Sequence, residues 1–326
     1  MKAIKFFAIS AMAAAMITSC SSEDELSQSN YPSDNIIRVT AGVNNAKTRA
    51  EGAGTEMKND FSLTIVNKNA SKYTYTDKVF SKSSGDWACS ETLLWQKSDA
   101  LVDIVAFAPA QTGKFNGVYA EGSIQPITYS VADDQSTKSD NNDLLYYYAK
   151  DFNPGTSLDK GKLNIQFNHA FCMIDINVTL GTEFNKPSIP TTSPIIKVTL
   201  GGTEIAANVN VTNAASVVTA SGEATATDIT TTNGSFTTAA DPEKNAISRF
   251  SCIAIPQTVG ANTFKVSLMT AGKRYEWTSA EPVELKSGYR YTLKLSMGND
   301  VVLLKGGGIT ATPWTEITSD KPLETD

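Results

Sequence analysis

The stretch Ala170-Phe171-Cys172-Met173-Ile174-Asp175-Ile176-Asn177-Val178-Thr179-Leu180 places an apolar side chain at every second position. Such alternation predicts a β-strand with one buried face, because successive side chains of a strand point to opposite sides of the sheet. Cys172 shares the even-numbered positions with isoleucine and valine, so we expect its thiol to face a core. The apolar pattern continues upstream, and we expect one strand over Leu163–Leu180.

Short runs of the same kind recur along the chain, separated by Gly, Pro, Asn and Asp. Few windows show the 3.6-residue period of a helix, so the sequence predicts an all-β protein of the sandwich or barrel type. The strands expected before residue 163 are Ile36–Val43, Phe61–Val66, Tyr73–Phe80, Glu91–Gln96, Val102–Ala108, Ser123–Tyr129 and Leu144–Ala149. Those expected after residue 180 are Ile195–Leu200, Glu204–Val211, Phe250–Ile255, Thr263–Thr270, Arg274–Thr278, Arg290–Met297 and Gly308–Trp314.

The chain has 326 residues, which corresponds to about two domains of roughly 150 residues each. The turn-forming segment Asp151-Phe152-Asn153-Pro154-Gly155-Thr156 is the best boundary between them. The sequence therefore predicts an N-terminal β-sandwich at 36–157 and a C-terminal β-sandwich at 158–326. Residues 203–241 are rich in Thr, Ala, Ser and Asn, and we expect short exposed strands and long loops there.

The N-terminus has the pattern of an export signal. Lys2 and Lys5 precede an apolar run over Phe6–Ile17, which is shorter than the roughly 20 residues that span a bilayer. Small residues then lead directly into Cys20, which resembles a bacterial lipobox. We therefore expect a lipoprotein signal peptide at 1–19, acylation of Cys20 and a polar tether at 20–35. An ordinary signal peptide with a nearby cysteine is the alternative.

Composition excludes some classes of partner. Hydrophobic residues make up 41% of the chain and charged residues 19%, so a packed core is expected. The net charge is −6, and removal of Lys2 and Lys5 with the signal peptide makes it −8. This acidic balance argues against nucleic acid or an anionic membrane surface as the main partner.

No constellation of catalytic, metal-binding or cofactor-binding residues is found. His169 is the single histidine and lies inside a predicted strand, so a structural role is expected. The acidic pair Asp133-Asp134 and nearby Asp140 have no EF-hand spacing, and we interpret them as a solvated loop rather than a calcium site. The triple glycine at 306–308 lacks the lysine and helix of a phosphate-binding loop and is interpreted as a flexible joint.

The remaining cysteines are Cys89, Cys172 and Cys252, without zinc-like spacing. We interpret them as small buried hydrophobic residues, and a disulfide between Cys172 and Cys252 is the alternative. The tryptophans favour core or interface packing, with a carbohydrate-stacking platform as the alternative; they are Trp87, Trp95, Trp277 and Trp314.

Several short motifs follow one another in a characteristic order. They are Ile36–Ala41 leading into Lys47–Ala50, Leu94–Gln96 with Val102–Pro109, Asn142–Tyr146, Ile165–Phe171, Ile255–Thr258, Leu285–Leu293 and Ile309–Trp314. In this order the chain resembles the fimbrillin family of Bacteroides-type bacteria, the Mfa-like and FimA-like pilins. The lipobox agrees with the resemblance, since these pilins reach the surface as lipoproteins.

The resemblance implies a fold and a mechanism. The fold is a pair of transthyretin-like Greek-key β-sandwich domains in tandem. The precursor is lipidated, carried to the outer membrane and cut by an Arg-specific protease after its first strand. Loss of that strand opens a hydrophobic groove, which a C-terminal strand of the next subunit fills by β-augmentation. A donor and a groove are different surfaces, so the contact builds open filaments.

Candidate residues for each step follow from the motifs. Cleavage is expected between Arg49 and Ala50, in a polar stretch suited to proteolysis, and an ordinary loop arginine is the alternative. The released strand is expected to bury its Ile37 face. The donor strand is expected in the run Val301, Val302, Leu303 and Leu304, or in the segment from Ile309 through Trp314. Pro313 removes one ladder donor, which favours keeping the Trp314 segment as an edge strand of its own domain.

The sequence therefore predicts a non-enzymatic stalk, tip or accessory subunit of surface fimbriae that mediates adhesion. Its partners are other fimbrial subunits and, through the lipid on Cys20, the outer membrane. The alternative is a surface lipoprotein that binds a host glycan or protein through exposed aromatics without polymerising, for which Trp87 and Trp277 are the candidates.

Overall fold

The computed structural model of the protein describes residues 30–44, 55–57, 59–110, 119–120, 123–124, 126–137, 143–222, 226–305 and 308–314. Cys20, Arg49 and Ala50 lie outside these residues. The described chain is built almost entirely from strands, which confirms the all-β prediction. Its helical elements are short turns: η1 (Ser71–Tyr73), α1 (Pro154–Ser157) and η3 (Thr182–Asn185). None of the described helices is long and apolar enough to cross a membrane.

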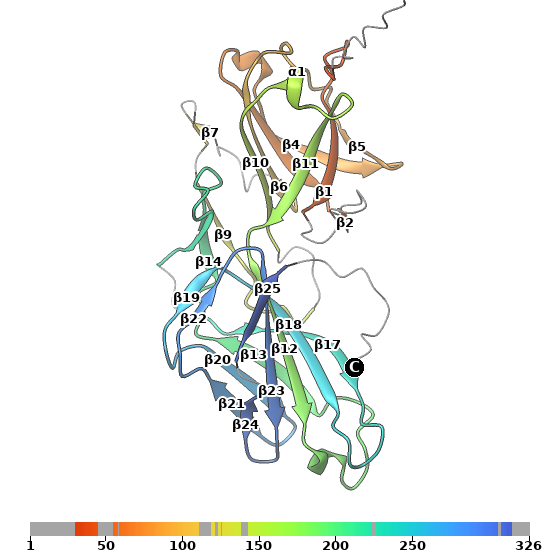
Figure 1. Ribbon diagram of the computed structural model, residues 1–326, viewed down its shortest axis with the longest axis vertical. Helices are drawn as coiled ribbons and strands as arrows, with labels where there is room; N and C mark the ends of the chain where they lie inside the picture. The colour runs from red at the N-terminus through yellow and green to blue at the C-terminus, as the bar shows by residue number, and fades with distance from the viewer. Residues whose placement is uncertain are drawn as a thin grey trace, which may run out of the picture.

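The molecule is elongated, with the eight-stranded sheet of the N-terminal half at one end and the larger sheets of the C-terminal half at the other (Figure 1). Eight strands of the N-terminal half form one sheet in the order β11-β10-β6-β3-β4-β5-β1-β2. Their bounds are β1 Arg38–Val43, β2 Thr55–Glu56, β3 Phe61–Asn67, β4 Tyr75–Ser83, β5 Asp86–Cys89, β6 Val102–Ala108, β10 Leu145–Phe152 and β11 Lys162–His169. The short strands β7 (Tyr119–Ala120) and β8 (Ser123–Ile124) pair with each other.

The first strand closes this sheet on itself. β1 pairs antiparallel with β5 through Val39 and Trp87, and parallel with β11 from Arg38↔Lys162 to Val43↔Phe167. Because β11 is also at the far end of the strand order, β1 bridges the two edges of the sheet. Without β1, the sheet would have two open edges, at β5 and at β11.

The C-terminal half contains two larger sheets that pack face to face. One has the order β17-β18-β12-β23-β24, with β25 also on β23, and the other has the order β16-β13-β20-β21. The bounds of the first are β12 Cys172–Leu180, β17 Thr232–Thr237, β18 Ile247–Ala254, β23 Tyr289–Met297, β24 Val302–Leu304 and β25 Thr310–Pro313. Those of the second are β13 Ile195–Gly201, β16 Ile229–Thr230, β20 Lys265–Thr270 and β21 Arg274–Thr278.

Two small sheets complete the C-terminal half. β9 (Ile127–Ser130) comes from the N-terminal half of the sequence but pairs with β14 (Ala206–Val209), which pairs in turn with β15 (Val218–Ala220). β19 (Gln257–Val259) pairs with β22 (Val283–Leu285). The strands of residues 203–241 are short, as expected for that segment, but they are not all exposed, because Ala207, Val209, Val218 and Ile229 are buried.

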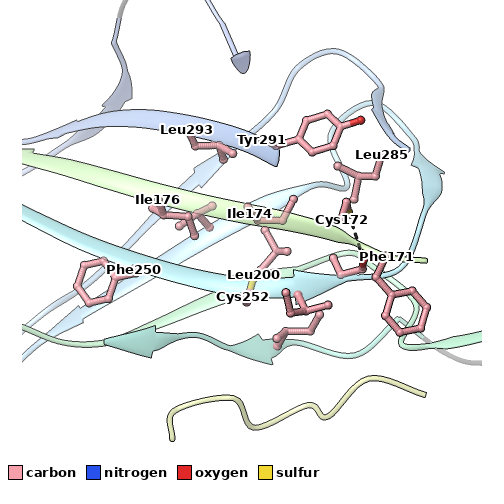
Figure 2. Close-up of a cluster of buried hydrophobic side chains, with 14 of the residues drawn as sticks. Phe171, Cys172, Ile174, Ile176, Leu200, Phe250, Cys252, Leu285, Tyr291 and Leu293 are labelled. Carbon is pink, nitrogen blue, oxygen red and sulfur yellow. Dashed lines mark hydrogen bonds between the residues drawn. The ribbon is translucent and has the colours of Figure 1, made fainter. Parts of the chain in front are cut away.

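The alternation that opens the sequence analysis is realised in β12. Its residues alternate between buried and half-buried from Cys172 to Leu180. Figure 2 shows Ile174 and Ile176 among Phe250, Cys252 and Leu293 of the neighbouring strands β18 and β23. A second buried cluster is formed mainly by side chains of the N-terminal sheet. In it, Phe61 stacks on Phe80 with 5.3 Å between ring centroids. The described residues therefore form two buried clusters, and the larger one extends from the C-terminal sheets to Val105 and Phe107 of β6 and to Leu144.

The expected single strand over Leu163–Leu180 is two strands that belong to different sheets. β11 pairs with β1 and β10, whereas β12 pairs with β18 and β23. Ala170 and Phe171 between them are both fully buried, so the alternation changes phase at that point. The change of sheet therefore falls between β11 and β12, after the predicted domain boundary at 157/158.

Candidate functional site

The apolar face of β1 is buried in the N-terminal core. Ile37, Val39 and Val43 are almost fully buried, which confirms that the strand buries its Ile37 face, and Thr40 on the opposite face is exposed. Burial of an aliphatic side chain stabilises a fold by about 1.5–3 kcal/mol, so these three contribute roughly 5–9 kcal/mol together. An empty β1 site would therefore be an apolar trough flanked by unpaired backbone groups, which is a costly surface in water.

Both ends of β1 are fixed by backbone contacts. The Ile37 N–H donates to Leu93 O at 2.9 Å, and the Asn44 N–H donates to Phe167 O at 2.6 Å. After Asn44 the chain returns as β2, which pairs with the end of β1 at Gly42↔Glu56 and Val43↔Thr55. The connection between β1 and β2 contains Arg49, so a cut there would separate β1 from the rest of the chain.

An exposed ion pair lies just before the strand. Arg38 donates to both carboxylate oxygens of Asp34, at 3.0 and 2.6 Å, and the Ile36 N–H donates to the same carboxylate. Mainly because of the Arg38 hydrogen bonds, the pKa of Asp34 is lowered to about 2. Since both side chains are exposed, the pair orients the entry to β1 and contributes little to stability.

β11 depends on β1 for most of its backbone pairing. Its other neighbour, β10, pairs with it only at Leu145↔His169 and Tyr146↔Asn168. Residues 163–167 of β11 have β1 as their strand partner in the described part of the chain. Removal of β1 would leave β11 attached to the sheet only through its C-terminal end.

The last two strands form one interrupted edge strand in the C-terminal half. β24 pairs antiparallel with Leu295–Met297 of β23, and β25 pairs antiparallel with Tyr289–Thr292 of the same strand. The Lys305 N–H donates to Lys294 O at 2.7 Å between them. Both expected donor segments thus lie on the outer edge of β23, where they can leave without disrupting an inner ladder. Pro313 is tolerated there because an edge strand has a free side.

The two segments differ in their side chains. In β24, Val302 is 7% exposed and Leu304 packs against the core, while Val301 and Leu303 on the other face are 49% and 59% exposed. β25, with the sequence Thr-Ala-Thr-Pro, is exposed along its whole length, and Ile309 before it is half-buried against the core. Since the β1 site buries one face of its strand and leaves Thr40 exposed on the other, a strand with apolar side chains on both faces has an apolar face for that site whichever way it inserts.

The end of β25 is fastened at the junction between the two halves. The Trp314 indole stacks on the His169 ring with 3.8 Å between centroids and 12° between planes. His169 Nδ1 shares a 2.6 Å hydrogen bond with Asp143 Oδ2. The backbone N–H of Trp314 donates to Gly288 O at 2.7 Å, and the backbone N–H of Gly288 donates to Phe171 O at 2.9 Å. Sequence reasoning gave His169 a structural role, and its burial agrees, but the contact with Trp314 was not foreseen.

The His169–Asp143 pair does not extend to a catalytic triad among the described residues. A triad needs a nucleophile on the second ring nitrogen, and His169 Nε2 is buried without a hydrogen-bond partner. The part of the chain that the structure describes also has no group of three or more His, Cys, Asp or Glu residues that could hold a metal ion. Asp134 accepts a hydrogen bond from the Ser136 N–H, as expected for a turn, and Asp140 lies outside the described residues.

The cysteines and tryptophans pack into the cores. Cys172 and Cys252 are buried free thiols and Cys89 is a half-buried one, so the alternative of a Cys172–Cys252 disulfide does not hold in this structure. Trp87 and Trp277 pack edge-on against Phe61 and Phe264 at 5.0 and 6.4 Å between ring centroids. Both indoles are half-buried in separate halves of the molecule, which gives no support to a shared glycan platform.

The comparisons agree with this architecture. A family model described as fimbrillin-like matches residues 48–314. A protein from Bacteroides ovatus with a cell-adhesion assignment has a TM-score of 0.60 and 15% identity, over 86% of this chain and 98% of its own. A similar protein from Bacteroides uniformis has a TM-score of 0.56 and 15% identity, over 87% and 100%. A fimbrial protein from Bacteroides vulgatus has a TM-score of 0.55 and 16% identity, over 86% and 99%.

These identities are low, so the solved structures are evidence for a shared fold. A comparison with curated proteins gives no match. The family model, in contrast, spans well over half of the sequence and includes β2 through Trp314. The protein therefore belongs to the fimbrillin-like family.

Proposed function

We propose that this protein is a subunit of surface fimbriae that assembles by proteolytic removal of β1 and insertion of a strand from another subunit. The observation that carries the proposal is the position of β1. It closes the N-terminal sheet, buries its apolar face in the core and is joined to β2 through the segment that contains Arg49. Removal of a strand so placed leaves a groove that only another strand can fill.

The segment Val301–Leu304 is the donor that we propose. Its alternating residues are apolar on both faces, and Val301 and Leu303, exposed in this position, gain burial if the strand inserts with their face toward the core of the groove. It occupies an outer edge of β23, so its departure breaks a single ladder. The exposed residues of β25 follow the donor segment in the chain and do not fill the groove in this proposal.

Cys20 anchors the precursor in this proposal. Acylation of Cys20 holds the chain on the outer membrane through the tether that precedes β1. A cut between Arg49 and Ala50 then releases the lipid and β1 together. In a subunit that is not cut, the lipid remains and the protein serves as an anchor of the fimbria.

Treatment of the full-length chain with an Arg-specific protease tests the proposal. Cleavage after Arg49 is expected to produce filaments or ladders of oligomers that size-exclusion chromatography separates from the monomer. Arg49→Lys keeps the charge but blocks such a protease, so this variant should stay monomeric. Arg38→Lys is the matched control and should polymerise like the unmodified chain. Monomers after complete cleavage at Arg49 would contradict the proposal.

A further inference from the structure

We infer that β11 couples the β1 site to the C-terminal strand of the same chain. Removal of β1 from the N-terminal sheet is then expected to loosen Trp314 and β25 as well. The physiological meaning of this coupling rests on the proposed removal of β1. The coupling itself is a property of the folded chain and is measurable whether or not the chain polymerises.

The first step concerns the support of β11. Between residues 163 and 167, β1 is the strand that holds β11 in the described structure, and β10 holds it only at Asn168 and His169. Removal of β1 therefore leaves five consecutive residues with no ladder, although Leu163, Ile165 and Phe167 still pack in the core. The strand keeps one hydrogen-bonded end, and that end carries His169.

The second step concerns what His169 holds. Its ring is 5% exposed and lies flat against the indole of Trp314, which is itself 7% exposed. The residues of β25 itself are exposed, so the apolar side chains that hold it are at its two ends, the half-buried Ile309 before it and the buried Trp314 after it. A shift of His169 thus removes the ring contact that holds the C-terminal end of β25 on its own chain.

The consequence is an order of events. A subunit that has lost β1 has an empty groove and a loosened β25, which follows the proposed donor segment Val301–Leu304 on the edge of β23, so that segment can leave. A strand bound in the groove restores the partner of β11 and favours the closed position of Trp314. A subunit is therefore expected to donate its strand before it accepts one, which makes growth of the filament directional.

Hydrogen exchange on the full-length chain tests the coupling without any cleavage. Val39→Asp places a carboxylate on the buried face of β1 and drives the strand out. Thr40→Asp puts the same charge on the exposed face and is the matched control. We expect the amides of residues 310–312 and 314 to exchange about tenfold faster in Val39→Asp than in Thr40→Asp, within the range usual for coupled sites. The amides of β20 should be unchanged.

Coupling between two sites is reciprocal, so a second variant tests the same inference from the other end. Trp314→Ala should accelerate exchange in β1 and in residues 163–167 by a similar factor, whereas Thr312→Ala on the exposed face of β25 should not. This arm decides the question if Val39→Asp fails to fold. Fast exchange of β1 without faster exchange around Trp314, or normal protection of β1 and β11 in Trp314→Ala, would overturn the inference. Either result leaves the polymerisation test of the proposed function unaffected.

Discussion

Asp34 is the residue whose titration reports most directly on the entry to β1. Arg38 lowers its pKa to about 2 from an ordinary 3.8. A lowered carboxyl pKa contributes stability that is present above pH 3.8 and is lost as the pH falls towards 2. Since the pair is exposed, we expect the effect on unfolding to be small and the effect on the titration itself to be clear.

Carboxyl NMR measures this pKa in the folded chain. Arg38→Gln should raise the pKa of Asp34 most of the way to its ordinary value, with the Ile36 N–H retaining part of the shift. Arg249→Gln, which removes an arginine that bonds Ser235 and Thr237, should leave Asp34 unchanged. A pKa of Asp34 that does not respond to Arg38→Gln would contradict the assigned ion pair.

The thiols give a second prediction for single residues. Burial raises the pKa of both Cys172 and Cys252, so neither forms the reactive thiolate near neutral pH. We expect iodoacetamide to label Cys89 in the native protein and to label Cys172 and Cys252 only after denaturation, as read by peptide mass spectrometry. A cross-linked Cys172–Cys252 peptide would show that the exported protein differs from this structure.

At the scale of elements, β24 separates the requirements of folding from those of assembly. Val302→Asp places a charge in the core of the subunit and should lower its free energy of unfolding by roughly 2–3 kcal/mol. Leu303→Asp changes an exposed position and should alter stability by about 0.5 kcal/mol or less. The β1 site, however, buries one face of the strand it holds; if the donor inserts with Leu303 toward the core, the Leu303→Asp carboxylate is buried there and this variant should not polymerise.

Chemical denaturation and the polymerisation assay together check this prediction. Thr312→Asp in the polar strand β25 is the control, and it should both fold and polymerise. Normal filaments from Leu303→Asp would show that Val301–Leu304 is not the inserted segment.

The elements also show why sequence reasoning succeeded in some places and failed in others. The alternation of β12 and the buried face of β1 could be predicted, because period-two burial is a local property of the chain. The separation of β11 from β12 was missed, although a local signal exists. Buried residues are odd-numbered in β11 from Leu163 to His169, both Ala170 and Phe171 are buried, and buried residues are even-numbered in β12 from Cys172 onward. One strand cannot bury both sets against one core.

At the scale of the whole molecule, long-range pairing was the part that the sequence did not reveal. The closure of the sheet by β1 and β11 joins residues 124 positions apart, and the contact of Trp314 with His169 joins segments from the two halves. No local pattern encodes such partners. The order of short motifs did predict the family, because it samples nearly the whole chain at once.

The proposed acceptor site and the proposed donor strand lie in different halves of an elongated chain (Figure 1). His169 at the end of β11 contacts Trp314 after β25. Sites so arranged are distinct surfaces, so their union between subunits builds an open filament rather than a closed ring. Whether a subunit first donates its own strand or first accepts one from another subunit then depends on whether its donor segment is released before its groove is filled.

The N-terminus of the protein isolated from assembled surface fimbriae tests the central claim most directly. Mass spectrometry of the intact subunit and of its first peptide identifies that residue and any lipid attached to it. If β1 leaves together with a lipid on Cys20, as proposed, the chain starts at Ala50 and carries no acyl group. Fimbriae whose subunits all begin at acylated Cys20 and retain Ile36–Val43 would contradict it.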